Sequence, residues 1–283
     1  DGIRDLVRSR GLGDVYKRQM LMDIIRISIS AGEEILKVYH AEDFGVEIKE
    51  DKSPLTIADK NANDVITGFL KTTQYPILSE EGKEIPFEER KNWKQFWLVD
   101  PLDGTKEFIK KNGEFTVNIA LIEEQKAVFG VIYAPVLDTL YCGYNNKAFR
   151  LENASKLISQ SKSIQDFEKI AEKLPLEKQE NTYKVVGSRS HMNEETQEFI
   201  ENLKNEHPEI EIVSKGSSLK ICLVAEGNAT IYPRFGPTME WDTAAGHAII
   251  NNIGGKVLEV NQGKELLYNK ENLLNPYFIV YPK

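Results

Sequence analysis

The sequence predicts an α+β fold in which helices and sheets are layered in two lobes. In the first half, apolar residues at helical spacing are followed by short apolar runs bounded by turn residues, which is typical of helices and an antiparallel meander. In the last third, short apolar runs alternate with helical patterns, which is typical of a second layered lobe. The 283 residues are 41% hydrophobic, which is enough for one large domain or two small ones with proper cores.

The first nineteen residues differ in pattern from the rest of the chain. They lack the apolar core of a signal peptide, and a clean amphipathic pattern begins only near Met20. We therefore expect residues 1–19 to be a non-native leader and Met20 or Met22 to be the natural start. A short disordered arm is the alternative.

In the N-terminal lobe, residues 20–155, the apolar spacing predicts two helices followed by strands. The first helix covers residues 20–40, and the second begins after Thr56, with Ala62, Ile66 and Leu70 on its apolar face. The strands are short apolar runs, predicted at residues 75–79, 96–99, 115–122, 127–134, 139–143 and 148–151.

The C-terminal lobe, residues 156–283, follows a polar stretch at residues 152–181 that is rich in Lys, Glu, Ser and Gln. Such a shift in composition places the lobe boundary near the start of that stretch. Beyond it, the pattern predicts strands at residues 183–187, 210–214 and 229–233, helices at residues 194–205, 217–226 and 242–252, and two terminal strands, the last at residues 277–281.

Composition excludes several classes of function. The net charge is −8, from 36 Lys and Arg against 44 Asp and Glu, so long-range attraction to a nucleic-acid polymer is not expected. The two cysteines, Cys142 and Cys222, form no CxxC pair, which argues against a disulfide framework or a zinc site and suits a reducing cytosol. No apolar run approaches the ~18 residues of a membrane-spanning segment.

The sharpest local motif is Asp100-Pro101-Leu102-Asp103-Gly104-Thr105, which directly follows the apolar run at residues 96–99. Pro101 restricts the backbone and Gly104 allows a tight turn, so two carboxylates and the Leu102 carbonyl can point into one pocket. Hard cations such as Mg²⁺ prefer oxygen ligands of this kind. An ordinary acidic turn that faces water is the alternative.

Three further acids strengthen the metal-site interpretation. Glu80 also follows an apolar run, so it too is expected at a strand end. Asp242 opens a predicted helix, where it can act as an N-cap or, together with the helix amides, help to hold an anion. Asp59 lies three residues after Thr56, which is the spacing of a capping box.

Four ordered blocks resemble the inositol monophosphatase superfamily. Residues 97–108 (WLVDPLDGTKEF) resemble its first signature and residues 241–247 (WDTAAGH) its second, while residues 53–59 and 79–81 match the two other expected blocks. The similarity extends from about Met20 to the C-terminus. It implies the αβαβα layered sandwich of the inositol monophosphatase and sugar phosphatase type, with most metal ligands in the N-terminal lobe.

Within the superfamily, the chain is most similar to the bacterial CysQ branch, which hydrolyses adenosine 3′,5′-bisphosphate to AMP and phosphate. The segments that carry this similarity are residues 105–109, 112–120, 216–220 and 232–237. The resemblance implies a Mg²⁺-dependent, lithium-sensitive phosphatase with a role in sulfur assimilation. An inositol monophosphatase or sugar-bisphosphate phosphatase is the nearest alternative, and a non-catalytic nucleotide- or metal-binding protein is a more distant one.

The resemblance also implies the metal ligands. Glu80, Asp100 and the Leu102 carbonyl would hold one Mg²⁺, and Asp100, Asp103 and Asp242 a second, so that Asp100 bridges the two ions. A third, weaker ion near Glu80 or Glu81 is left open, and Mn²⁺ is expected to be able to replace Mg²⁺. Thr105, paired with Asp59, would orient the attacking water and accept its proton.

Substrate contacts follow from the same resemblance. The scissile phosphate would lie against Glu80, Leu102, Asp103, Gly104, Thr105 and the start of the Asp242 helix. Ser217, Lys220, Arg234 and His191 would hold the sugar, the base or the second phosphate, because an arginine fork binds two phosphate oxygens. A solvated helix lysine and a surface arginine are the alternatives for Lys220 and Arg234.

The expected partner is a small phosphorylated nucleotide, with no nucleic-acid polymer and no transmembrane segment. Both a monomer and a homodimer remain open. The expected location is the cytoplasm, with peripheral association at the inner membrane left open by the relatives.

Overall fold

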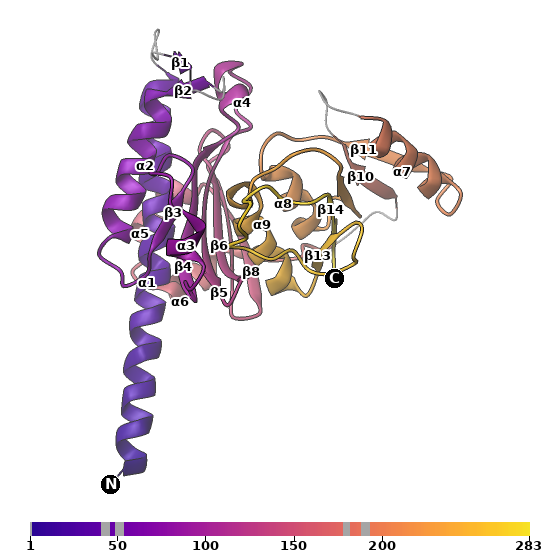
Figure 1. Ribbon diagram of the computed structural model, residues 1–283. Coiled ribbons are helices and arrows are strands. Elements are labelled where there is room, and N and C mark those ends of the chain that lie inside the picture. The colour runs from indigo at the N-terminus through magenta and orange to yellow at the C-terminus, as the bar shows by residue number, and fades with distance from the viewer. Residues whose placement is uncertain (1, 41–45, 49–53, 178–181, 188–192) are drawn as a thin grey trace.

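A computed structural model describes residues 2–40, 46–48, 54–177, 182–187 and 193–283, with side chains left undescribed at residues 2–18, 46–48 and 54–56. Layers of helices and sheets alternate across the molecule, from α1 and α2 through a large sheet, α8 and α9 and two smaller sheets to α7 (Figure 1). The predicted α+β layered sandwich is therefore confirmed. Within the described residues, no helix is both long and apolar enough to cross a membrane.

The first helical layer consists of α1 (Gly2–Tyr39) and α2 (Ile57–Leu70), which pack against each other. The helix predicted over residues 20–40 begins at Gly2 instead, so the stretch expected to be a leader continues the same helix. The leader and its alternative, a disordered arm, both stay predictions. No proline interrupts residues 2–19, so nothing forces a helix end there. That part of α1 extends beyond the rest of the molecule (Figure 1).

The large sheet has seven strands in the order β3-β4-β5-β6-β7-β8-β9. Only β3 and β4 are parallel, and the predicted antiparallel meander is confirmed from β5 to β8. The strands are β3 (Ile77–Ser79), β4 (Gln95–Asp103), β5 (Thr116–Glu123), β6 (Lys126–Ala134), β7 (Thr139–Tyr144), β8 (Lys147–Glu152) and β9 (Glu172–Lys173).

The polar stretch at residues 152–181 contains elements that the sequence pattern did not predict. Helices α5 (Ala154–Gln160) and α6 (Ile164–Ile170) pack against α1, and β9 pairs with β8. The large sheet therefore continues beyond residue 155, where the boundary between the lobes was expected. Other short elements were also not predicted, among them the antiparallel pair β1 (Val46–Ile48) and β2 (Pro54–Thr56), α3 (Phe87–Arg90) and α4 (Thr105–Ile109).

Hydrophobic cores cover both faces of the large sheet. Side chains alternate between faces along a strand, so Trp97 and Val99 pack with α1 and α2, whereas Phe96 and Leu98 pack on the side of α8 and α9. A central strand covered on both faces is apolar at every position, which explains the continuous apolar run that identified β4.

On the second face, α8 (Leu219–Glu226) and α9 (Glu240–Ile253) separate the large sheet from the smaller ones. Glycines set the position of α9, because a Cβ at Gly130 would lie 2.2 Å from the Ala245 carbonyl oxygen and one at Gly143 2.7 Å from the Ile249 Cα. The backbone of α9 therefore contacts β6 and β7 closely.

The remaining elements form the outer layers. A three-stranded sheet has the order β12-β14-β13, and a parallel pair joins β10 to β11. These elements are β10 (Tyr183–Val186), α7 (Glu194–Lys204), β11 (Ile210–Val213), β12 (Tyr232–Arg234), β13 (Lys256–Glu259) and β14 (Phe278–Tyr281).

Candidate active site

The end of β4 positions the central acids. The pairing of β4 with β5 is irregular between Asp100 and Asp103, so the strand bends there. The Leu102 amide donates to Asp100 Oδ1 at 3.1 Å, which closes a turn around that carboxylate. Gly104 follows with φ of 95°, in the left-handed region that glycine adopts most readily, and α4 (Thr105–Ile109) begins directly after it. The predicted turn of the DPLDGT motif therefore occurs at this strand end.

Asp242 reaches the site from the first turn of α9. The helix begins at Glu240, two residues earlier than predicted, so Met239 rather than Asp242 occupies the N-cap position. Asp242 instead accepts a hydrogen bond from the Met239 amide at 2.8 Å, which satisfies one of the unpaired donors at the helix start. The predicted N-cap role is therefore wrong. Asp242 lies three residues after the N-cap, and from there its carboxylate accepts a hydrogen bond from the N-cap amide.

Four carboxylates act electrostatically on Asp100, and we call Asp59, Glu80, Asp100, Asp103 and Asp242 the carboxylate cluster. Asp100 is 1% exposed, and burial together with the negative charges of the four others raises its pKa well above the ordinary value. Burial and the charge of Asp103 raise the pKa of Asp242 to about 8. Acids at α2, the end of β3, the end of β4 and α9 therefore all act on the pKa of Asp100, and their role as metal ligands stays a prediction.

The cluster suits a hard divalent cation by its chemistry. Its donors are carboxylate oxygens and the Leu102 carbonyl, the ligands that Mg²⁺ prefers. Asp100, Asp103 and Asp242 form no ion pair with a basic side chain in the described part of the chain, so the shifted pKa values reflect charge that a cation would neutralise. Among the described residues, however, no three His, Cys, Asp or Glu side chains are close enough to hold a metal ion as they stand.

Asp59 and Thr105 are the expected catalytic pair, and the structure shows the surroundings of each. Asp59, in the first turn of α2, is 1% exposed and close enough to Asp100 to raise its pKa. The Thr105 hydroxyl donates to the Leu102 carbonyl at 3.4 Å. Thr105 thus lies beside an expected metal ligand, and its pairing with Asp59 stays a prediction.

Ser218 connects the two halves of the site, and the sequence analysis did not assign it a role. Its side-chain oxygen lies 2.8 Å from Asp103 Oδ2 and 2.9 Å from the Asp242 carbonyl, and it accepts from Asn118 Nδ2 at 2.8 Å. Asn118 is held in turn by Thr116, whose hydroxyl donates to Asn118 Oδ1 at 3.0 Å. The Gly-Ser-Ser-Leu-Lys segment was the only signal, since no spacing in the sequence relates residues 103 and 218.

A cavity of about 560 Å³ opens beside Asp103 and Gly104 and continues toward the loop before α8. That loop requires a glycine at residue 216, because a Cβ there would lie 2.7 Å from the Glu114 carbonyl oxygen. The lining residues come from two separate stretches of the chain, 103–114 and 214–234: Asp103, Gly104, Lys106, Glu107, Lys110, Asn112, Glu114, Ser214, Lys215, Gly216, Ser217, Lys220 and Arg234. A smaller cavity of about 80 Å³ adjoins it and is lined by Asp103 and Asp242 as well as Ser217, Lys220 and Arg234.

The predicted substrate residues Ser217, Lys220 and Arg234 therefore line cavities next to the carboxylate cluster. Burial lowers the pKa of Lys220, although the charges of Asp103 and other acids act in the opposite direction. Arg234 donates through Nη2 to the Pro237 carbonyl at 2.9 Å, while its buried Nε has no acceptor among the described residues. Both cations are thus available to an anionic ligand. His191 lies outside the described residues.

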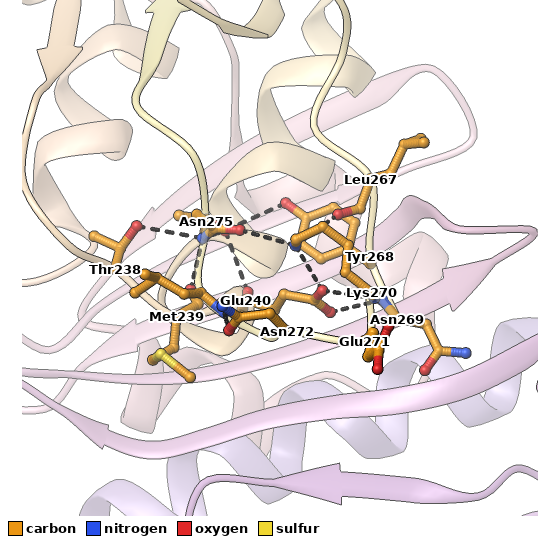
Figure 2. A network of polar contacts seen from close by, with 12 residues as sticks. Thr238, Met239, Glu240, Leu267, Tyr268, Asn269, Lys270, Glu271, Asn272 and Asn275 are labelled. Carbon is orange, nitrogen blue, oxygen red and sulfur yellow. Dashed lines mark hydrogen bonds and ion pairs between the residues drawn. The ribbon is translucent and has the colours of Figure 1, made fainter. Parts of the chain in front are cut away.

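A second polar network supports the first turn of α9 (Figure 2). The Glu240 carboxylate, 0% exposed, accepts from the amides of Asn269 and Lys270 at 2.6 and 3.0 Å and from Lys270 Nζ at 2.6 Å. Asn275 donates to the Met239 carbonyl at 2.8 Å. We call Glu240, Asn269, Lys270 and Asn275 the anchor network, and its contacts hold the backbone that presents Asp242.

The chain is similar in sequence and in structure to several known proteins. The sequence model of the inositol monophosphatase family matches residues 17–277. A protein of Salmonella typhimurium named 3′(2′),5′-bisphosphate nucleotidase CysQ is 46% identical over 265 residues, which cover 92% of this chain and 99% of that protein. Its namesake in Escherichia coli K12 is 45% identical over the same shares. The crystal structure of CysQ from Bacteroides thetaiotaomicron superimposes with a TM-score of 0.88 at 47% identity, covering 95% of this chain and 98% of that one.

Proposed function

Because the chain belongs to the inositol monophosphatase family, whose members use Mg²⁺, we propose that it is a Mg²⁺-dependent phosphatase acting on adenosine 3′,5′-bisphosphate. The single observation that carries the proposal is the environment of Asp100: a buried carboxylate whose pKa is raised by four other acids. Such an arrangement is costly without a cation and favourable with one. The relatives named as 3′(2′),5′-bisphosphate nucleotidases point to the substrate.

Glu80, Asp100, Asp103, Asp242 and the Leu102 carbonyl would hold the metal. Bound Mg²⁺ polarises a phosphoryl group and makes water more acidic. Because no three of the acids are drawn together at present, we expect their side chains to turn toward one another when the cation binds. The number of ions, and replacement of Mg²⁺ by Mn²⁺, stay predictions.

The remaining site residues would guide water and protons. In the reaction, a water oxygen bonds to the 3′-phosphorus while the bond from phosphorus to the ribose 3′-oxygen breaks, which yields AMP and inorganic phosphate. Thr105, beside the Leu102 carbonyl, would orient the water, and Asp59 would take its proton. The ribose oxygen leaves with a proton supplied by solvent.

The cavity supports a substrate with two separate anionic groups. The acids and the start of α9 lie at one end, and Lys220 and Arg234 lie beside them. We infer that the reacting phosphate lies at the acids and that these two cations contact the rest of the nucleotide, including its 5′-phosphate. An arginine fork with an unused Nε is well suited to that contact.

A panel of phosphate-release assays tests the proposal. The protein, with Mg²⁺ and with EDTA, would be offered adenosine 3′,5′-bisphosphate, inositol 1-phosphate and fructose 1,6-bisphosphate. We expect Mg²⁺-dependent hydrolysis with the highest kcat/KM for the nucleotide. A higher value for inositol 1-phosphate would overturn the substrate assignment but keep the phosphatase, whereas no hydrolysis of any compound would favour a binding protein.

The oligomeric state, the cytoplasmic location and lithium sensitivity stay predictions. Gel filtration with light scattering and inhibition by LiCl address the first and the last directly.

A further inference from the structure

The outer wall of the 560 Å³ cavity carries two lysines that the proposed reaction does not use. Lys106 and Lys110 both belong to α4 or its end, four residues apart, so they lie on one face of that helical turn. Both line the same cavity as Asp103, Ser217, Lys220 and Arg234. The cavity thus connects the carboxylate cluster to a pair of cations at its rim.

The lining of this cavity carries more basic than acidic side chains, whereas the whole protein has a net negative charge. Its lining holds five basic residues, Lys106, Lys110, Lys215, Lys220 and Arg234, although the net charge of the chain is −8. Of its three acids, Asp103 belongs to the carboxylate cluster, Glu107 acts electrostatically on Lys220, and Glu114 lies 3.7 Å from Lys215.

Lys106 and Lys110 are exposed and form no ion pair with any acid in the described ranges, whereas many other exposed lysines do. Lys37, Lys91 and Lys204, for example, each pair with a glutamate three residues away. Two unpaired cations on one wall of a substrate-sized cavity raise the local concentration of anions there and favour a ligand that carries negative charge at that end.

We propose that Lys106 and Lys110 form a distal anion subsite that selects substrates by the charge they carry at the end remote from the reacting phosphate. The inference rests on the proposed function. Lys220 and Arg234 can neutralise a single 5′-phosphate, so the two lysines beyond them fit a nucleotide whose 5′ end carries a further anionic group. They are specificity-determining residues, since they lie on the cavity wall and take no part in bond breaking.

Such a subsite acts mainly on KM. Contacts remote from the reacting phosphorus are the same in the bound substrate and in the transition state. They therefore stabilise both states equally and lower KM without changing kcat. Because both lysines are exposed, the effect of each is modest and decreases with added salt.

The test compares three substrates that share one reacting group. Adenosine 3′-phosphate has no anion at its 5′ end, adenosine 3′,5′-bisphosphate has one anionic group, and adenosine 3′-phosphate 5′-phosphosulfate has two. Relative to adenosine 3′-phosphate, we expect Lys106→Gln/Lys110→Gln to lower kcat/KM about threefold for the bisphosphate and about tenfold for the phosphosulfate, through KM. In the unmodified protein, a higher salt concentration should reduce the kcat/KM of the bisphosphate and of the phosphosulfate relative to that of adenosine 3′-phosphate.

Two matched variants accompany the measurement. Lys106→Arg/Lys110→Arg keeps the charge and should restore most of the discrimination. Lys94→Gln/Lys126→Gln removes two exposed lysines at the opposite end of β4 and β6, and should leave the ratios as they are.

Equal losses for all three substrates, or no loss for any, would refute the subsite while leaving the phosphatase assignment intact. Failure of the unmodified protein to hydrolyse any of the three would instead overturn the proposed function, and the subsite with it.

Discussion

Glu240 and Asp242 lie two residues apart in the first turn of α9, yet they have opposite electrostatic surroundings. Glu240 belongs to the anchor network, where two backbone amides and the Lys270 ammonium neutralise it within the chain (Figure 2). Asp242 faces the carboxylate cluster, where Asp103 and burial raise its pKa. The first turn of α9 therefore carries both an acid neutralised by direct contacts and an acid that forms no ion pair in the described part of the chain.

The difference distinguishes two uses of a buried acid. A carboxylate with its own cation and amide donors stabilises the backbone around it. Carboxylates that crowd one another without a basic partner raise the free energy of the metal-free protein, and they are retained where a cation from solution binds. Each prediction below concerns either the acids that lack a basic partner or the acids that have partners within the chain, and leaves the other kind unchanged.

The largest effect is expected from Asp103→Asn. It removes a charged ligand from the carboxylate cluster and should lower kcat by about 10²–10³-fold or more. Circular dichroism should show an unchanged fold, because the amide keeps an oxygen near Ser218. Asp64→Asn, an exposed acid on α2, serves as the matched control with normal turnover. Normal phosphate release by Asp103→Asn would refute the metal-site assignment.

Glu240→Gln tests the anchor network. It leaves Lys270 without its carboxylate in a buried setting, so the free energy of unfolding should fall by about 2–4 kcal/mol in urea denaturation. Glu271→Gln makes the same chemical change on an exposed side chain one residue after Lys270 and should stay within about 0.5 kcal/mol of the parent. Equal stability of the Glu240 and Glu271 variants would mean that the network contributes nothing.

A smaller effect is the pH dependence of the metal-free protein. Because the pKa of Asp242 is raised from 3.8 to about 8, the folded state holds its proton more tightly than the unfolded state. Stability should therefore fall as the pH rises from about 4 to about 8. Thermal melts in EDTA should show this slope, and Mg²⁺ should raise Tm more at pH 8 than at pH 5. A Tm gain independent of pH would contradict the shift.

The smallest expected effect is also a dependence of stability on pH, with the opposite sign to that of Asp242. It arises from Glu265, which contacts His247 on α9. Burial raises the pKa of Glu265, but the hydrogen bond with His247 at 3.0 Å, the charge of His247, the Val257 backbone and the charge of Lys256 together outweigh burial. They lower that pKa below its ordinary value of 4.5. This contribution to stability is present above about pH 4.5 and is lost as the pH falls through the lowered value. Glu265→Gln should flatten the acid limb of a Tm against pH curve slightly. An unchanged acid limb would show that the pair of Glu265 and His247 does not contribute to stability.

Local sequence determined much of the fold and the kinds of atoms in the site. The continuous apolar run before Asp100 predicted a strand covered on both faces, and β4 has that environment. Gly104 after two acids predicted a tight turn, and its φ of 95° bears this out. These inferences succeeded because backbone geometry relates residues that are near in sequence.

Only the tertiary structure decided which of these atoms meet. Close contacts of α9 with Gly130 and Gly143 bring Asp242 to the end of β4, and Ser218 joins it to Asp103 across 115 residues of sequence. Sequence analysis expected Asp242 to be a metal ligand, with a helix cap as the alternative, and assigned no role to Glu240, since neighbouring acids on one helix look alike until their contacts are known. Packing between distant segments has no fixed spacing along the chain, and that packing gave the two acids their different surroundings.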